Sequence, residues 1–306
     1  IPLWNPNSFS GTPLLANFQS GSFYPLNILF FILPFSISWG TLILLESLLG
    51  MIFFYLYLAN LKVNRYASIL GSIVFGFSGF SIVWMEWGTI IHAALWIALI
   101  LLSIDKIFSY LQENSKLKNH ISKIWSLIFV FSLISSFFAG HLQTFFYVFI
   151  VSLAYFFARW FQFGRKKSIL LLFFILYSLL FILTFVQWLP TIQFILLSAR
   201  NVDLVNWQSP GWFIPWQNLI QFIAPDFFGN PTTLNYWGTW NYGEFIGYVG
   251  ILPLIMAFFA LFFRHDRKTL FFGTLFFLSL IFSLPTIFAK IPYILKIPFI
   301  NTSQPT

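Results

Sequence analysis

The sequence predicts an all-α polytopic membrane protein, and three features point to this class: its composition, its long apolar runs and the placement of its basic residues. Hydrophobic residues make up 59% of the 306 positions and charged residues only 8%, with a mean hydropathy of +0.84. Soluble domains carry about 25% charged residues, so a composition this apolar indicates a chain that packs against lipid. The chain has no Cys and therefore no disulfide or thiolate chemistry.

Runs of about 20 apolar residues predict transmembrane helices, because a helix of that length crosses the hydrocarbon core of a bilayer. About eight such runs occur, at roughly 40–60, 67–84, 89–105, 124–140, 143–160, 168–190, 244–263 and 269–289. The run from Leu26 to Ser38 is shorter and contains Pro34, so we expect an interfacial or re-entrant helix there. One long polar interruption, at about 191–243, is expected to be a loop.

The basic residues predict the orientation of these helices. Most of the 16 Lys and Arg residues fall in alternate loops, whereas the opposite side holds only Arg200, Lys290 and Lys296. The positive-inside rule makes the basic loops cytoplasmic and places residues 1–39 and about 191–243 outside. The net charge of +8 therefore reflects topology, and we expect no nucleic-acid partner.

The first 25 residues, called here the head, contain no charged residue and many turn-formers, amides and aromatics. This composition is typical of a loop that faces water or a ligand. We expect an outer segment at 1–39, a transmembrane bundle at 40–290 and the start of a further outer segment at 291–306. An outer start without Met or a signal peptide suggests a fragment that lacks an upstream helix and is also truncated at its end.

The unusual polar residues collect at the predicted outer ends of the helices. Glu86 lies in an outer turn, His141 and Gln143 open one helix, and Glu244 opens another. Helix N-termini present free N–H groups and positive partial charge, which suits a phosphate at headgroup level. Each residue also has a structural reading, because His141 can cap its helix and both acids suit the helix dipole.

Arg200 is the only Arg on the predicted outer side, and guanidinium groups match phosphate oxygens in pairs, although Arg200 can also pair with Asp203. Glu46 lies inside a predicted span and needs an internal partner. Asp105 and Asp266 lie among the cytoplasmic basic residues, where a solvated structural role suffices. Amide and Trp side chains suit sugar hydroxyls and rings, and the candidates of this kind are Trp4, Asn5, Asn17, Gln19 and Trp240.

Motifs of soluble enzymes are missing from the sequence. It has no phosphate-binding loop, no dinucleotide-binding glycine pattern and no zinc-protease motif. The four His are scattered and there is no Cys, so no structural metal site is predicted.

Several short motifs, in order along nearly the whole chain, resemble the bacterial YfhO-type membrane proteins. Because each motif is short and apolar, their order and spacing carry the likeness. They are LWNPNSFSGTPLLANFQSGSFYP (3–25), FGFSGF (75–80), AGHLQTFFY (139–147), LSAR (197–200), APDFFG (224–229) and GYVGILPL (247–254).

This resemblance implies a glycosyltransferase of the GT-C type on the outer face of the bacterial cytoplasmic membrane. Such enzymes transfer a sugar from a polyprenyl-phosphate donor, here to a cell-surface glycopolymer or lipid acceptor. Residues 1–39 would be the second half of the first outer loop, and the usual acidic base would lie upstream of Ile1. We expect Arg200 to hold the donor phosphate and Glu86, His141 and Glu244 to act on hydroxyls. No cofactor beyond the donor substrate is expected.

Two other functions fit the same residues. One is a transporter or flippase for a lipid-linked sugar or polymer, and the other is a non-catalytic assembly scaffold. Transporters tend to have internal repeats and polar groups near the bilayer midplane. No repeat is visible here, and the polar residues lie at one surface, with Glu46 as the main exception. The scaffold stays open because the expected base is not in the sequence.

Overall fold

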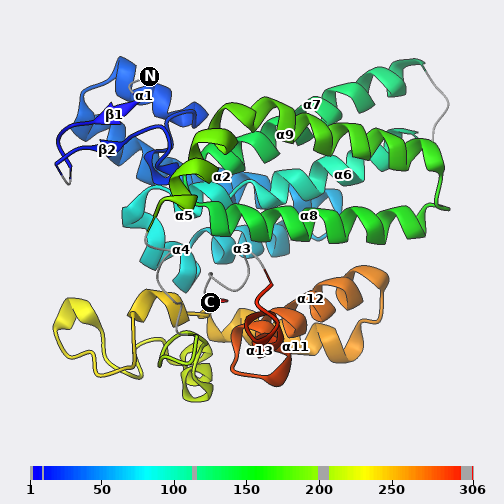
Figure 1. Ribbon diagram of the computed structural model, residues 1–306. Coiled ribbons are helices and arrows are strands. Elements are labelled where there is room, and N and C mark those ends of the chain that lie inside the picture. Colours follow the sequence, from blue (N-terminus) through cyan, green and yellow to red (C-terminus); the bar gives the residue numbers. More distant parts are fainter. Residues whose placement is uncertain (1–2, 9, 112–115, 199–206, 298–304, 306) are drawn as a thin grey trace. The chain divides into compact units, whose positions relative to one another are not determined.

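The computed structural model describes residues 3–8, 10–111, 116–198, 207–297 and 305, and of residues 116–119 it describes the backbone alone. The chain forms two compact units, both built mainly from helices (Figure 1). Unit 1 comprises residues 1–76 and 85–198, and unit 2 comprises residues 77–84 and 199–306.

Unit 1 opens with a small hairpin and continues as a bundle of long helices. The antiparallel strands pair Trp4 with Pro13 and Asn5 with Thr12. The elements are β1 (Trp4–Asn5), β2 (Thr12–Pro13), η1 (Phe18–Ser20), η2 (Pro25–Ile28), α1 (Leu29–Ile32), α2 (Phe35–Asn60), α3 (Arg65–Gly76), η3 (Met85–Trp87), α5 (Ile90–Ala94), α6 (Ile97–Leu111), α7 (Lys116–Phe138), α8 (Leu142–Gln162) and α9 (Lys167–Leu196). The elements marked η are short 3₁₀ helices.

Helix α6 lies in the middle of unit 1, with α2, α7 and α8 packed against it (Figure 1). Most of its residues are buried, including the polar Ser103 and Asp105. Aromatic rings join it to its neighbours: Phe156 of α8 stacks on Phe173 of α9 at 4.3 Å, and both lie against Phe108 of α6. Stacked rings of this kind add to the stabilisation that comes from burial.

Unit 2 consists of short helices and long connections. Its elements are α4 (Gly79–Trp84), η4 (Trp216–Phe222), η5 (Pro231–Thr233), η6 (Tyr242–Phe245), α11 (Ile251–Phe263), α12 (Arg267–Ser283) and α13 (Ile287–Ile294). The Gly79 amide donates to the Tyr248 carbonyl at 2.7 Å. A Cβ at Gly79 would lie 2.3 Å from the Ile246 side chain and 3.1 Å from the Tyr248 carbonyl, so this close packing favours glycine.

The predicted class is confirmed, because the described residues contain five helices long and apolar enough to cross a bilayer, or up to seven if each bent pair is one span. The predicted number of eight is not confirmed. Two of the expected spans are the bent pairs, with breaks of 40° between α3 and the helix from Gly79 to Trp87 and 60° between α12 and α13. Pro285, between α12 and α13, limits the backbone at the second break.

Two predicted boundaries are wrong. The helix expected at 244–263 begins at Ile251, since the preceding stretch contains Gly247 and Gly250, and Gly250 has a φ of 94°. The run from Leu26 to Ser38 is divided between η2, α1 and the first turn of α2. Pro34 is the residue before α2, where its fixed φ and missing N–H are tolerated.

Candidate functional site

The head is tied to the last turns of α9 in unit 1. Gln187 donates to the Leu15 carbonyl at 2.6 Å, and Thr191 donates to the Ala16 carbonyl at 3.2 Å. The turn between α7 and α8 also approaches the head, because a Cβ at Gly140 would lie 3.2 Å from the Gln19 carbonyl. We call this end of unit 1 the head end.

The head residues proposed for sugar contacts divide into two groups. Asn5 accepts a hydrogen bond from the Asn7 amide, and Asn17 caps η1 by accepting one from the Gln19 amide, so both amides hold local turns. Gln19 is an exposed side chain. Trp4 is 55% exposed, with its ring lying over Gly11. Trp4 and Gln19 are thus the two that present surface to a ligand.

His141 takes the structural role that its position allowed. It is the residue before α8, and its Nδ1 atom accepts from the Thr144 amide at 3.2 Å and lies 2.8 Å from the Thr144 hydroxyl. Gln143 donates to the hydroxyl of Tyr147, one turn further along α8. Gln19 lies beside the turn that carries His141, while Glu86 is exposed in η3.

A buried polar row lies at the head end. The Tyr24 hydroxyl is 2.8 Å from His92 Nδ1, and His92 Nε2 is 3.4 Å from Glu46 Oε1. These residues come from the head, α5 and α2, and their exposed fractions are 4%, 0% and 0%. Glu46 was expected to need an internal partner, and His92 Nε2 lies 3.4 Å from it, although neither carboxylate oxygen has a hydrogen bond. Tyr24 lies 68 positions before His92, and no local pattern marked it.

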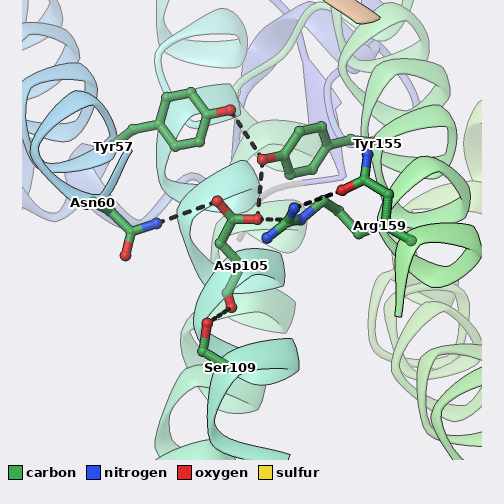
Figure 2. Close-up of polar contacts among 7 residues, drawn as sticks. Tyr57, Asn60, Asp105, Ser109, Tyr155 and Arg159 are labelled. Carbon is green, nitrogen blue, oxygen red and sulfur yellow. Dashed lines mark hydrogen bonds and ion pairs between the residues drawn. The ribbon is translucent and has the colours of Figure 1, made fainter. Parts of the chain in front are cut away.

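A second buried network joins α2, α6 and α8 (Figure 2). Asp105 forms an ion pair with Arg159 at 2.7 Å and accepts hydrogen bonds from Tyr155 at 3.0 Å and from Asn60 at 3.2 Å. Tyr57 donates to the Tyr155 hydroxyl at 3.1 Å. The prediction of a solvated Asp105 is therefore wrong, because this side chain is 2% exposed. Its counter-ion, Arg159, was interpreted only as one of the basic residues that indicate topology.

Asp266 fits the solvated structural role predicted for it. It precedes α12, where it accepts from the Lys268 and Thr269 amides and pairs with Arg264. Although partial burial raises the pKa of Asp266, the hydrogen bonds from Thr269, Arg264 and Lys268 outweigh it and lower that pKa to about 2.

Unit 2 contains an open cavity of about 530 Å³, which we call the unit 2 cavity. Its wall combines one ammonium group, two amides, two hydroxyls and aromatic rings. The lining residues are Trp207, Gln208, Ser209, Pro210, Gly211, Phe213, Pro215, Gln217, Thr239, Pro285 and Lys290. Behind the wall, Tyr293 packs against Phe213 and stacks with Trp207. Such a mixture of rings, amides and one cation suits a polar ligand that carries negative charge.

The sequence-based candidates included one neighbour of this cavity. Trp240 is 52% exposed and packs over Gly211, where a Cβ would lie 2.6 Å from it. Lys290 was not among the candidates, although it was one of three basic residues on the predicted outer side. Arg200 and Asp203 lie outside the described residues.

Glu244 does not open a helix as predicted. It lies in η6, which Asn241 caps by accepting from the Gly243 amide. In the same loop, Tyr242 and Asn230 both donate to the Asp226 carboxylate. Partial burial and the Asp226 carboxylate raise the pKa of Tyr242, which keeps the phenol protonated.

No group of three or more His, Cys, Asp or Glu side chains within the described ranges is arranged to hold a metal ion. Comparison with protein-family models, with curated proteins and with solved structures finds no match to this chain. The YfhO-type resemblance remains a prediction from the motifs.

Proposed function

We propose that this chain acts as a GT-C-type glycosyltransferase, moving a sugar from a polyprenyl-phosphate donor to a cell-surface polymer or lipid. The observation that carries the proposal is the unit 2 cavity, which places Lys290 beside amides, hydroxyls and an aromatic wall. We propose the outer face of the bacterial cytoplasmic membrane as the place of reaction. The basic loops would then be cytoplasmic.

The cavity supplies the interactions that a sugar phosphate requires. Gln208 and Gln217 can donate to and accept from sugar hydroxyls, and the Trp207 ring offers an apolar face. As the glycosidic C–O bond breaks, negative charge grows on the departing phosphate, and under this proposal the Lys290 ammonium stabilises that charge. By analogy with glycoside hydrolysis, the sugar carbon passes through an oxocarbenium-like state.

The acceptor hydroxyl also needs a base to take its proton. Within the chain, the candidates for this base are Glu86, His141 and Glu244. His141 already uses Nδ1 to cap α8. Arg200 keeps its proposed role on the donor phosphate, together with Lys290.

The test compares two lysines at α13. Full-length protein in lipid vesicles is supplied with polyprenyl-phosphate sugar, and sugar transfer to the acceptor fraction is measured. Lys290→Ala should lower the rate about 100-fold, the scale on which loss of one charge-stabilising donor acts. Lys296→Ala, an exposed lysine just beyond the same helix, should retain the wild-type rate. Wild-type transfer by Lys290→Ala would remove the unit 2 cavity from the reaction.

A transporter for a lipid-linked sugar is the second candidate, and the pair Glu46–His92 favours it. Ionisable side chains within spanning helices are rare and often mark transport paths. A dithionite-quenching assay with a fluorescent lipid-linked sugar separates the two functions. Flipping without sugar transfer would favour the transporter, transfer without flipping the transferase, and neither activity the scaffold.

A further inference from the structure

Three titratable groups lie in one row inside unit 1, and none of them is needed for the reaction proposed above. The row runs from the Tyr24 hydroxyl through both ring nitrogens of His92 to the Glu46 carboxyl group, with gaps of 2.8 Å and 3.4 Å. The Tyr24 and His92 rings lie 4.9 Å apart between centroids. An imidazole between two oxygen groups can take a proton at one nitrogen and release one from the other.

The carboxyl group at the inner end of the row is unusually poor in partners. Both Glu46 oxygens are buried without a hydrogen bond of good geometry, and His92 Nε2 is the polar atom that lies 3.4 Å from Oε1. The backbone of Leu42, one turn earlier on α2, offers the imidazole a second partner. A buried carboxylate with so little compensation is costly, which makes the gain of a proton favourable.

Other charges do not offset this group within the part of the chain that the structure describes. The buried Asp and Glu side chains there are Glu46 and Asp105, and Asp105 is engaged by Arg159. Glu86 on η3 is exposed, and the head carries no charge. From α7, the side chain hydrogen-bonded to α5 is neutral, since Ser136 donates to the Ala93 carbonyl. The protonation of the row therefore depends on its own three side chains and not on neighbouring charges.

We propose that Tyr24, His92 and Glu46 form a proton-binding relay that carries a proton from the head into the helices of unit 1. In the deprotonated state, Tyr24 donates to Nδ1 and the Nε2 proton points to the Glu46 carboxylate. A proton arriving at the Tyr24 oxygen releases the phenolic proton to Nδ1. The Nε2 proton passes to Glu46, which becomes a carboxylic acid. Tyr24 and His92 end neutral, with the imidazole in its other tautomer.

The position of Tyr24 makes the head the entrance of this relay. Tyr24 stands between η1 and η2, in the segment that Gln187 and Thr191 tie to α9. Glu46, in contrast, lies in the interior of α2. Uptake of one proton thus changes the charge of a spanning helix, and it requires neither a sugar donor nor an acceptor.

Infrared difference spectroscopy tests the relay on the full chain in lipid bilayers. Between about pH 9 and about pH 6, above the ordinary range for exposed carboxyls, a carboxylic-acid carbonyl band should appear. The band should be lost in Glu46→Gln and retained in Glu86→Gln, the matched exposed acid. If wild-type protein shows no such band, the proposal is overturned, whatever the stability of the variants.

Two further variants test whether the three groups act together. His92→Gln removes the donor to the carboxylate and should raise the midpoint of the band by about one pH unit or more. After a rapid pH drop, Tyr24→Phe should slow the rise of the band at least about tenfold. An unchanged midpoint in His92→Gln, or an unchanged rate in Tyr24→Phe, would show that Glu46 titrates alone and would overturn the relay.

Discussion

At the scale of single residues, unit 1 shows two ways of burying an acid. Asp105 on α6 is held by Arg159, Tyr155 and Asn60, so each oxygen has a donor. Glu46 is equally buried but has His92 as its near neighbour. The first arrangement is that of a structural clamp between helices, whereas the second leaves room for proton exchange.

Asp105→Asn should destabilise unit 1 strongly. The substitution leaves the largely buried Arg159 guanidinium without its counter-ion, and loss of one partner of a buried pair costs about 3–5 kcal/mol. Thermal unfolding in detergent measures the effect. Asp266→Asn is the matched control, because that ion pair is exposed and Asn also caps helices, so less than about 1 kcal/mol is expected. Equal losses of stability in the two variants would contradict the structural role of Asp105 between the helices.

Arg200→Ala should abolish sugar transfer while leaving expression and membrane insertion intact, because the donor phosphate would lose its guanidinium partner. Arg264→Ala, an exposed Arg between α11 and α12, serves as the control. Wild-type transfer in Arg200→Ala would exclude that residue from the site.

Prediction succeeded for a residue whose type and place in the sequence alone indicate its environment. An acid inside an apolar run needs a partner wherever it occurs, so Glu46 could be recognised. Tyr24 and Lys290 could not, since a Tyr in a loop and a Lys in a short helix acquire a role only from neighbours brought together by folding. Asp105 was misjudged because its partner Arg159 lies 54 positions away, among residues that also explain topology.

At the scale of elements, hydropathy located the helices but not their breaks. Each long apolar run contains a helix, because a lipid environment leaves no other way to satisfy the backbone. Glycine and proline residues explain where these helices start and bend. The stretch before α11 is not helical, and α12 and α13 are separated by a bend of 60°. The unit 2 cavity lies among such non-helical connections, which no periodic pattern marks.

Gly250→Ala tests the glycine before α11. Its φ of 94° is strained for any side chain, and a Cβ would lie 3.1 Å from Pro253, so a loss of about 1–2 kcal/mol is expected. Gly40→Ala on α2 is the control, because a Cβ there meets nothing within 4 Å and Ala favours the helix. Thermal unfolding of both variants gives the comparison, and a stable Gly250→Ala would argue against this backbone.

At the scale of the whole molecule, the charge pattern makes a topology that can be measured directly. The chain has no Cys, so a single Cys substitution introduces the one thiol that a maleimide can label. Asn7→Cys in the head and Ser168→Cys at the start of α9 are both exposed positions. A membrane-impermeant maleimide added to intact cells should label the first, and label the second only after permeabilisation. The reverse pattern would invert the orientation and remove the outer-face reaction with it.

The ties between the head and α9 also set an order for biogenesis. The carbonyls of Leu15 and Ala16 receive donors that lie 172 and 175 positions later in the chain. A ribosome therefore makes the head long before the side chains that hold it exist. Nascent chains that end before Gln187 should carry a protease-sensitive head, and protection should begin once α9 has entered the bilayer. The head thus becomes fixed only after α9, the last helix of unit 1, has been made.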